Sequence, residues 1–415
     1  MKRTAIDWTP YIPDNWKEIR IKDIARLQSG NSLTSDNIDE MGDYPVYGGN
    51  GLRGYTDSYT NDGSYVLIGR QGALCGNINY AEGKFYATEH AIVVYPNRKN
   101  ENYKWLGETL RCADYNRLSA SAAQPGLAVN VLNNQLIPYP PLEIRNRIAD
   151  YLDAKTTEID KKIELLGKKR DAYNRLKTAT INRAVTRGLN EHVKLKDSGV
   201  DWIGEIPEHW KQFRLKDIGY MYSGLSGKSG EDFRSEDQSI VKPYIPFTNI
   251  LYNTIVSGEN FHYVVMGDEE FQNIVKKDDI LFLMSSEDYE SIAKSAVVLD
   301  DFGEIFLNSF CRGLRITQNT AYAPFVNYQL NSTKYRDALR FEARGFTRIN
   351  IKIDRIEGHI VTLPPFNEQK QIAAYLDDRC AKIDAAVTII DKQIDALKRL
   401  KRSLVNEVVT GKWKA

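Results

Sequence analysis

The chain has 415 residues, is 42% hydrophobic and carries 56 Lys and Arg side chains against 55 Asp and Glu, a formal net charge of +1. This length allows two or three domains with cores of their own, and the lack of an apolar run of about 18 residues excludes a membrane-spanning helix. The charge balance neither indicates nor excludes a nucleic-acid partner. Four separated cysteines without a CxxC pair, and a start (Met1–Thr4) without an apolar signal core, predict a cytoplasmic protein with reduced thiols and no metal site.

A short head motif opens the chain and returns 194 residues later. The matching residues are Trp8, Ile12-Pro13, Trp16-Lys17, Arg20, Lys22-Asp23-Ile24 and Ser29-Gly30, which recur as Trp202, Ile206-Pro207, Trp210-Lys211, Arg214, Lys216-Asp217-Ile218 and Ser223-Gly224. This repetition predicts two equivalent domains.

The first insert, from about Ile24 to Tyr139, alternates short β-like runs (65–68 and 91–95) with Gly-rich loops, and its spacing predicts a helix over 103–118. Gly49-Asn50-Gly51-Leu52-Arg53-Gly54 matches the dinucleotide-binding pattern GxGxxG. Residues 55–60 read as strand or loop rather than as the helix that a phosphate site needs. A nucleotide site is therefore disfavoured.

Two long helices are predicted, over 142–188 and 364–415, and residues of the first recur 224 positions later in the second. Each is a rod of about 65 Å with one narrow apolar stripe. The stripe residues are Leu152, Ile159, Ile163, Leu166 and Tyr173 in the first helix, and Leu376, Ile383, Val387, Ile390, Ile394, Leu397 and Leu404 in the second. Paired with aligned ends and antiparallel, the helices would place Ile390 opposite Ile163. A simple dimerisation coiled coil is the alternative.

The second insert, from about Ile218 to Leu363, is some 30 residues longer than the first, because the two repeat offsets differ by that amount. Strands are predicted near 280–284 and 295–299, and a helix near 324–341. Both inserts are thus α+β. The predicted order is a first head and domain (1–141), a helix (142–188), a second head and domain (189–363) and a second helix (364–415).

The loops of the inserts combine Gly with side chains that can read base edges. Arg pairs with guanine and Asn or Gln with adenine, while Gly lets the backbone approach phosphates. Ordinary turn chemistry is the alternative for any single residue. The candidates are Asn50, Arg53, Arg70, Gln71, Gln124 and Asn130 in the first insert, and Lys242, Asn249, Arg344, Thr347, Arg348 and Asn350 in the second.

No catalytic pattern is present in the sequence. It holds no GxxxxGK[ST] phosphate loop and no HExxH, and the five histidines are scattered. Leu363-Pro364-Pro365-Phe366 is similar to the Asn/Asp-Pro-Pro-Tyr/Phe motif of adenine methyltransferases, but Leu363 lacks the side-chain acceptor that holds the base amino group.

Four segments carry a family resemblance: Tyr47–Gly51, Lys196–Gly199, Trp202–Trp210 and Leu363–Gln369, the last continuing to Asp377. With the duplicated head, insert and helix, they resemble the specificity subunits of type I restriction-modification systems over essentially the whole chain. Tyr47 joins the DNA-binding candidates through this resemblance. The first copy departs from the pattern where Ile144-Arg145 replace Glu368-Gln369, so the two helix starts need not be capped alike.

The resemblance implies two target recognition domains, each reading half of a split sequence in double-stranded DNA, spaced by two antiparallel helices. It implies two modification subunits that carry the S-adenosylmethionine chemistry, and restriction subunits that translocate and cut DNA. The chain itself would bind no cofactor and would not be an enzyme. Two other hypotheses remain open: a stand-alone DNA-modifying enzyme, and a scaffold or regulator that binds protein.

Overall fold

The computed structural model describes residues 1–72, 74–98, 101–119, 126–233, 241–267 and 270–412. The chain forms two compact units. Unit 1 comprises Met1–Lys168 with Ile390–Ala415, and unit 2 comprises Lys169–Ile389. Each unit therefore combines one globular domain with a part of both long helices. No helix in the described ranges is long and apolar enough to cross a bilayer.

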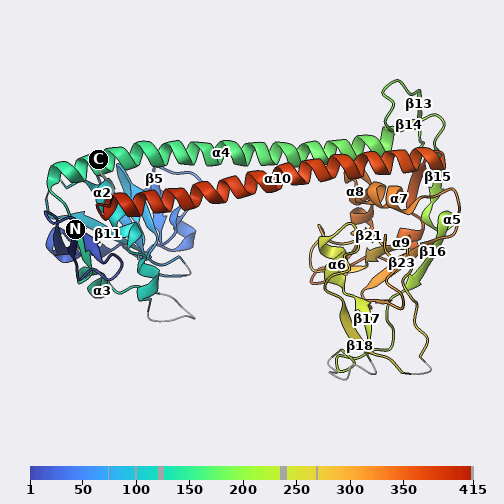
Figure 1. The fold of residues 1–415 in the computed structure, drawn as a ribbon, viewed down its shortest axis with the longest axis horizontal. Coiled ribbons are helices and arrows are strands. Elements are labelled where there is room, and N and C mark those ends of the chain that lie inside the picture. The colour runs from blue at the N-terminus through green and yellow to red at the C-terminus, as the bar shows by residue number, and fades with distance from the viewer. Residues whose placement is uncertain (73, 99–100, 120–125, 234–240, 268–269, 413–415) are drawn as a thin grey trace. The chain divides into compact units, whose positions relative to one another are not determined.

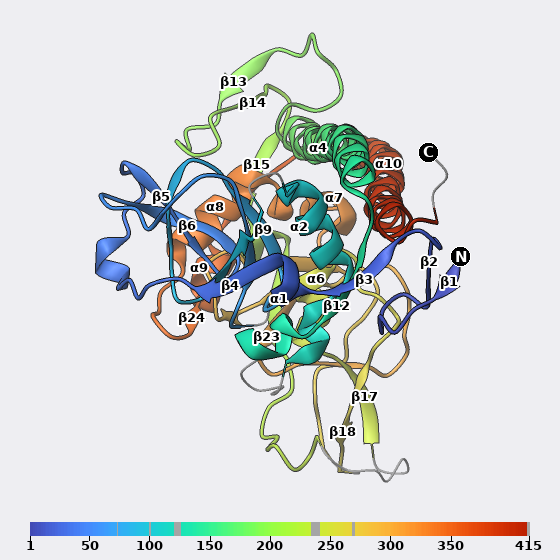
Figure 2. The same ribbon diagram turned by 90° about the vertical axis from the view of Figure 1, so that its left-hand side faces the viewer.

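The long helices are α4 (Leu142–Arg187) and α10 (Phe366–Val409), coloured green and red in Figure 1. In unit 1, Lys401 Nζ donates to Asp160 at 2.6 Å, and in unit 2, Lys177 Nζ donates to Asp384 at 2.7 Å. Asp160 and Lys177 recur 224 residues later as Asp384 and Lys401, so the two ion pairs are equivalent in the repeat. Both units thus show the helices antiparallel, and Figure 2 looks along them side by side. The predicted fold class, α+β with an internal repeat and two long antiparallel helices, is confirmed.

The register differs from the aligned-ends expectation. Aligned ends would place Asp160 opposite residue 393, whereas its partner is Lys401, eight residues further along. Eight residues correspond to about 12 Å of helix, more than a lysine side chain spans. The helix starts explain the shift, because they pack on the globular domains: Ile148 and Leu152 in the core of unit 1, and Ile372 and Leu376 in that of unit 2. The pairing of Ile390 with Ile163 is therefore wrong.

The stripe residues are all buried or half-buried. Leu152, Ile159, Leu376, Ile383, Ile390 and Ile394 are buried, whereas Ile163, Leu166, Tyr173, Val387, Leu397 and Leu404 are half-buried. Leu176 and Leu400, which recur in the repeat but lie off the stripe, are exposed.

Each long helix ends at a glycine beside a head tryptophan. Gly188 and Gly411 have φ of +71° and +72°, the left-handed conformation that ends helices. A side chain added at Gly188 would meet Trp210 at 3.5 Å, and one added at Gly411 would meet Trp16 at 3.0 Å. The end of α4 thus packs on the second head and the end of α10 on the first.

The two helix starts use different chemistry at equivalent positions. Gln369 is fully buried, accepts from the backbone N of Tyr322 at 2.8 Å and donates to Thr320 and Pro364. Its counterpart Arg145 is also buried and forms an ion pair with the buried Glu101. The guanidinium of Arg145 lies 4.1 Å from the ring centre of Tyr139. The substitution noted in the sequence therefore changes how the first helix is fastened.

The globular part of unit 1 is built from strands and short helices. Its strands are β1 (Lys2–Arg3), β2 (Tyr11–Ile12), β3 (Lys17–Arg20), β4 (Ala25–Ser29), β5 (Tyr44–Gly48), β6 (Gly51–Thr56), β7 (Asn61–Asp62), β8 (Tyr65–Gly69), β9 (Ile78–Ala81), β10 (Lys84–Ala87), β11 (Ala91–Pro96) and β12 (Leu136–Tyr139). Its helices are α1 (Ile21–Ile24), α2 (Tyr103–Cys112) and α3 (Val129–Asn133), with 3-10 turns η1 (Ser35–Asn37) and η2 (Tyr115–Leu118).

The globular part of unit 2 has the same kinds of elements. Its strands are β13 (Leu195–Asp197), β14 (Glu205–Pro207), β15 (Lys211–Arg214), β16 (Gly219–Ser223), β17 (Val241–Ile245), β18 (His262–Val265), β19 (Ile280–Leu283), β20 (Ser285–Ser286), β21 (Ser295–Val297), β22 (Phe306–Leu307), β23 (Cys311–Ile316), β24 (Ile349–Asn350) and β25 (Ile360–Leu363). Its helices are α5 (Leu215–Ile218), α6 (Phe247–Tyr252), α7 (Ala323–Asn331), α8 (Thr333–Glu342) and α9 (Ile353–Glu357).

The strand pairing repeats between the units. The antiparallel sheet β4-β11-β8-β9 corresponds to β16-β23-β19-β21, and the pair β3-β12 to β15-β25. A second sheet in each unit contains one parallel pair, β5 with β10 and β17 with β22. The repeat seen in the heads and helices therefore extends through the inserts, whose sequences show little of it.

Two expected helices are shorter than predicted. The helix over 103–118 ends at Cys112 and is followed by η2, and the one over 324–341 is split into α7 and α8. The break falls at Ser332, whose backbone is extended and whose hydroxyl donates to the carbonyl of Gln329 at 2.7 Å. This local hydrogen bond competes with helix continuation. The segment after GxGxxG starts in β6 and contains no helix, as expected.

The buried pair of Glu101 and Arg145 gives a stability prediction. Replacing Arg145 by Ala leaves the Glu101 carboxylate buried and unpaired, which costs about 3–5 kcal/mol. Denaturant unfolding, followed by a probe in unit 1, should show this loss. Lys162→Ala, which removes an exposed pair with Glu158, is the control and should change stability by less than about 0.5 kcal/mol. Equal stability of the two variants would contradict the assignment.

The stripe of α10 gives a second prediction. Ile390 is 4% exposed, so Ile390→Asp buries a carboxylate and should cost about 3 kcal/mol or more. Leu400→Asp places the same charge on the same helix at a side chain that is 55% exposed, and should be nearly neutral. Thermal unfolding of both variants measures the difference, and an unchanged midpoint for Ile390→Asp would show that this position does not face the seam.

Candidate nucleic-acid interface

In unit 1, several loops converge at one end of the β5-β6 hairpin. A side chain added at Gly49 would meet the carbonyls of His90 and Gln71 at 3.1 and 3.2 Å. The Arg70 backbone joins these loops, because its N donates to His90 O at 2.8 Å and its O accepts from Leu127 N at 2.9 Å. The segments around residues 49, 70, 90 and 127 thus form one cluster held by backbone contacts.

Four predicted DNA-binding residues lie at this cluster. Asn50 and Gln71 are exposed, and Asn50 accepts a long 3.5 Å hydrogen bond from Asn77. Arg53 is exposed, with its side chain folded beside Gly48, and Arg70 is half-buried. In the described ranges neither guanidinium has a hydrogen-bond or ion-pair partner. The structure therefore brings together two uncommitted cations and two carboxamides.

Three other predicted residues of unit 1 lie elsewhere or are not described. Tyr47 is half-buried and packs edge-on against Phe85, with ring centres 5.7 Å apart, and burial raises the pKa of its hydroxyl. Asn130 is exposed on α3, a helix that contacts β4 and α1. Gln124 lies outside the described residues.

In unit 2, a closed loop carries four predicted residues. Arg344 and Asn350 exchange two backbone hydrogen bonds of 2.9 and 2.8 Å across its base. Gly345 is required there, because its φ is +146° and an added side chain would lie 2.0 Å from Arg348 O. The loop presents exposed Thr347 and Arg348. Their positions are therefore fixed by the backbone.

Arg348 stands beside a cleft of about 280 Å³. Its guanidinium lies 4.5 Å from the ring centre of Phe310, a cation–π contact that orients the charge. The Arg344 guanidinium instead donates to the carbonyls of Phe341 and Ala343, and the Asn350 amide donates to Arg348 O. Of the two guanidinium groups in this loop, that of Arg348 is the one without a hydrogen bond among the described residues.

The structure corrects the prediction for Asn249. This residue is 5% exposed, and its side chain donates to Ser257 O at 2.9 Å and accepts from Ser257 N at 3.0 Å. It fastens a loop inside the fold and cannot face a ligand. Lys242 is exposed on β17, but its ammonium forms a 2.7 Å ion pair with Glu304.

Aromatic side chains beside Arg348 were missed by the sequence reasoning. Phe346 is fully exposed at the tip of the loop, Tyr252 is 79% exposed and Phe310 is 44% exposed. Exposed aromatic rings supply stacking and apolar contacts to bases and sugars. A Phe inside a Gly-Arg loop is a signal that could have identified Phe346, whereas Tyr252 and Phe310 come from distant parts of the sequence.

Comparisons with known proteins identify the family of the chain. The family model of the type I restriction modification DNA specificity domain matches residues 13–168 and 207–399. The specificity subunit of the type I restriction enzyme EcoprrI from Escherichia coli is 40% identical over 141 residues, which are 33% of this chain and 35% of that protein. The MjaVIII specificity subunit from Methanocaldococcus jannaschii is 22% identical over 97% of this chain and 93% of its own length.

A solved structure supports the fold. It comes from work on the complex assembly and conformational transition of a type I restriction-modification system. Its chain aligns over 97% of this chain and 100% of its own length. The TM-score is 0.71 at 17% identity. With both repeats matched by the family model, this chain belongs to the type I restriction modification DNA specificity family.

Proposed function

We propose that this chain reads a split DNA sequence, with the loop cluster of unit 1 on one half-site and the loop of Arg344–Asn350 in unit 2 on the other. The observation that carries this proposal is that the two units repeat the same strand order. In each unit, a loop held by backbone hydrogen bonds presents an arginine whose guanidinium makes no hydrogen bond among the described residues. Arginine is the commonest reader of guanine in the major groove. Two such loops on one repeated frame suit a bipartite site.

The chain acts as a non-catalytic subunit in the cytoplasm. Two modification subunits carry S-adenosylmethionine and methylate adenine, and restriction subunits translocate and cut the DNA. The long helices set the spacing of the half-sites and offer exposed faces to the modification subunits. A scaffold that binds only protein would give no sequence-dependent mobility shift against random competitor DNA.

The two arginines give a prediction about half-sites. Arg70→Ala should relax recognition of one half-site and Arg348→Ala that of the other, each costing about 1–3 kcal/mol in binding. Methylome sequencing of cells that express each variant with its modification subunit measures both effects. Arg175→Ala, an exposed residue of α4, is the control. Equal weakening on all sequences would assign the arginines to phosphates instead.

The helix pair gives a prediction about the spacer. Seven residues added to each helix, after Lys168 in α4 and after Ile389 in α10, keep both stripes in phase and add about 10 Å. At about 3.4 Å per base pair, the spacer should grow by about three pairs with unchanged half-sites. Rotation about the duplex should weaken binding. Methylome sequencing reads the spacer directly, and changed half-site bases with the old spacer would refute the proposed role of the helices.

A further inference from the structure

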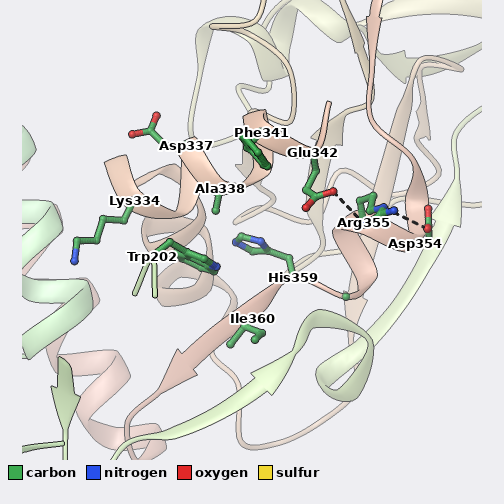
Figure 3. A pocket seen from close by; sticks show the side chains of 11 residues that line it. Trp202, Lys334, Asp337, Ala338, Phe341, Glu342, Asp354, Arg355, His359 and Ile360 are labelled. Atoms are coloured by element: carbon green, nitrogen blue, oxygen red, sulfur yellow. Dashed lines mark ion pairs between the residues drawn. The ribbon is translucent and has the colours of Figure 1, made fainter. Parts of the chain in front are cut away.

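A second pocket in unit 2 borders the loop of Arg344–Asn350, because the Arg344 guanidinium lies 5.9 Å from the ring centre of Phe341, which lines the pocket. Its volume is about 590 Å³, and its lining comes from the head loop, α8, α9 and the residues before β25. Figure 3 shows the imidazole of His359 between Trp202 and Glu342, with Phe341 above it. The pocket is thus walled by aromatic rings.

His359 is a buried polar group without a partner. Its side chain is 7% exposed, and among the described residues its Nε2 has no hydrogen-bond partner. The ring stacks on Trp202 at 5.1 Å and 15°, and meets Tyr335 edge-on at 5.9 Å. Burial lowers the pKa of His359 to about 3, so the imidazole is neutral at physiological pH. In its Nδ1–H tautomer, Nε2 is an unused acceptor.

The charged residues of the pocket are mainly acidic. Asp337, Glu342 and Asp354 outnumber Lys334 and Arg355. Both cations are already used: Lys334 Nζ donates to Ile203 O at 2.9 Å, and Arg355 pairs with Glu342 at 3.2 Å. The acids are paired as well, Asp337 with Arg340 at 3.1 Å and Asp354 with Arg355 at 3.7 Å. The lining therefore offers no uncommitted cation to a phosphate, which disfavours DNA.

The mouth of the pocket is apolar. Phe341, which lines the pocket, is 76% exposed. Because Nε2 lies below the accessible surface, a ligand reaches it only when a side chain at the mouth turns aside. If Phe341 is that side chain, it leaves its contact with Arg344, whose guanidinium lies 5.9 Å from its ring centre. An exposed apolar mouth over a polar floor is typical of a protein contact that receives one anchoring side chain.

We propose that this pocket receives an arginine side chain of a protein partner, a modification subunit docked on the second repeat. A guanidinium is planar and positively charged, stacks on aromatic rings, and donates N–H groups that match the unused Nε2. The inference rests on the proposed function for the identity of the partner.

The first repeat lacks this anchor. Leu215 N donates to His359 O at 3.0 Å, and at the equivalent place Ile21 N donates to Gln135 O at 3.1 Å. Gln135 is thus the counterpart of His359. Its amide donates to Val131 O at 3.2 Å and is already satisfied. The two repeats therefore hold their partner subunits unequally.

The test uses N-acetyl-arginine methylamide as the probe and the full chain with 15N-labelled histidine. The probe should shift one imidazole resonance saturably, and His359→Gln, which installs the side chain of the first repeat, should remove that resonance and weaken binding about tenfold. Phe341→Ala, at an exposed position, should also weaken binding. His192→Gln, an exposed histidine, is the control and should leave the affinity unchanged.

Matched probes separate the alternatives. The citrulline analogue has the same shape without the charge, and should bind at least about tenfold more weakly. Equal binding of citrulline, stronger binding of adenosine, or no shift at all would each overturn the proposal. In the assembled complex, His359→Gln should weaken the binding of one of two modification subunits in native mass spectrometry while the methylated sequence stays the same. A changed sequence with normal assembly would contradict this pocket and leave DNA reading intact.

Discussion

The antiparallel pairing of α4 and α10 is the constraint on which the rest of the fold depends. Because the helices run in opposite directions, the end of each helix packs on the head of the other repeat, and neither globular unit is complete without both repeats. The two equivalent ion pairs, Asp160 with Lys401 and Asp384 with Lys177, join side chains that are 33–56% exposed, and each contributes less than about 1 kcal/mol. The buried stripe and the helix ends in the two cores supply the stabilisation, and the ion pairs mark the register.

The repeated frame preserves backbone geometry and not side-chain chemistry. Arg145 and Gln369 occupy equivalent positions, yet one uses a buried ion pair with aromatic rings and the other a set of hydrogen bonds to backbone atoms. Gln135 and His359 likewise accept equivalent backbone hydrogen bonds, from Ile21 and Leu215, but their side chains make different contacts. Because strand pairing fixes the main chain, side chains at equivalent positions can diverge without moving the domains. This separation allows the unequal partner contacts that we propose for the two repeats.

Local patterns in the sequence predicted a large part of the fold. Repeat offsets, apolar spacing and helix-ending glycines are local signals, and they identified the two heads, both long helices and the α+β inserts. The helix register could not be predicted, because it depends on how far each helix start is drawn into a globular core. The role of Asn249 could not be predicted either, because its partner Ser257 belongs to a loop whose path is set by tertiary contacts. Phe310 and Tyr252 reach Arg348 only through the sheet arrangement.

The two loops that we propose to read DNA solve one physical problem in different ways. A flexible arginine side chain loses conformational entropy when it is held against a base, so a site that orients it beforehand binds with more discrimination. In unit 2, Phe310 holds the guanidinium of Arg348 by its face and leaves the N–H edges free. In unit 1, Arg70 is placed by its own backbone, whose N and O are both bonded to neighbouring loops. Because these devices lie in loops, and the strand order beneath them is the same, their side chains can change while the repeated frame stays constant.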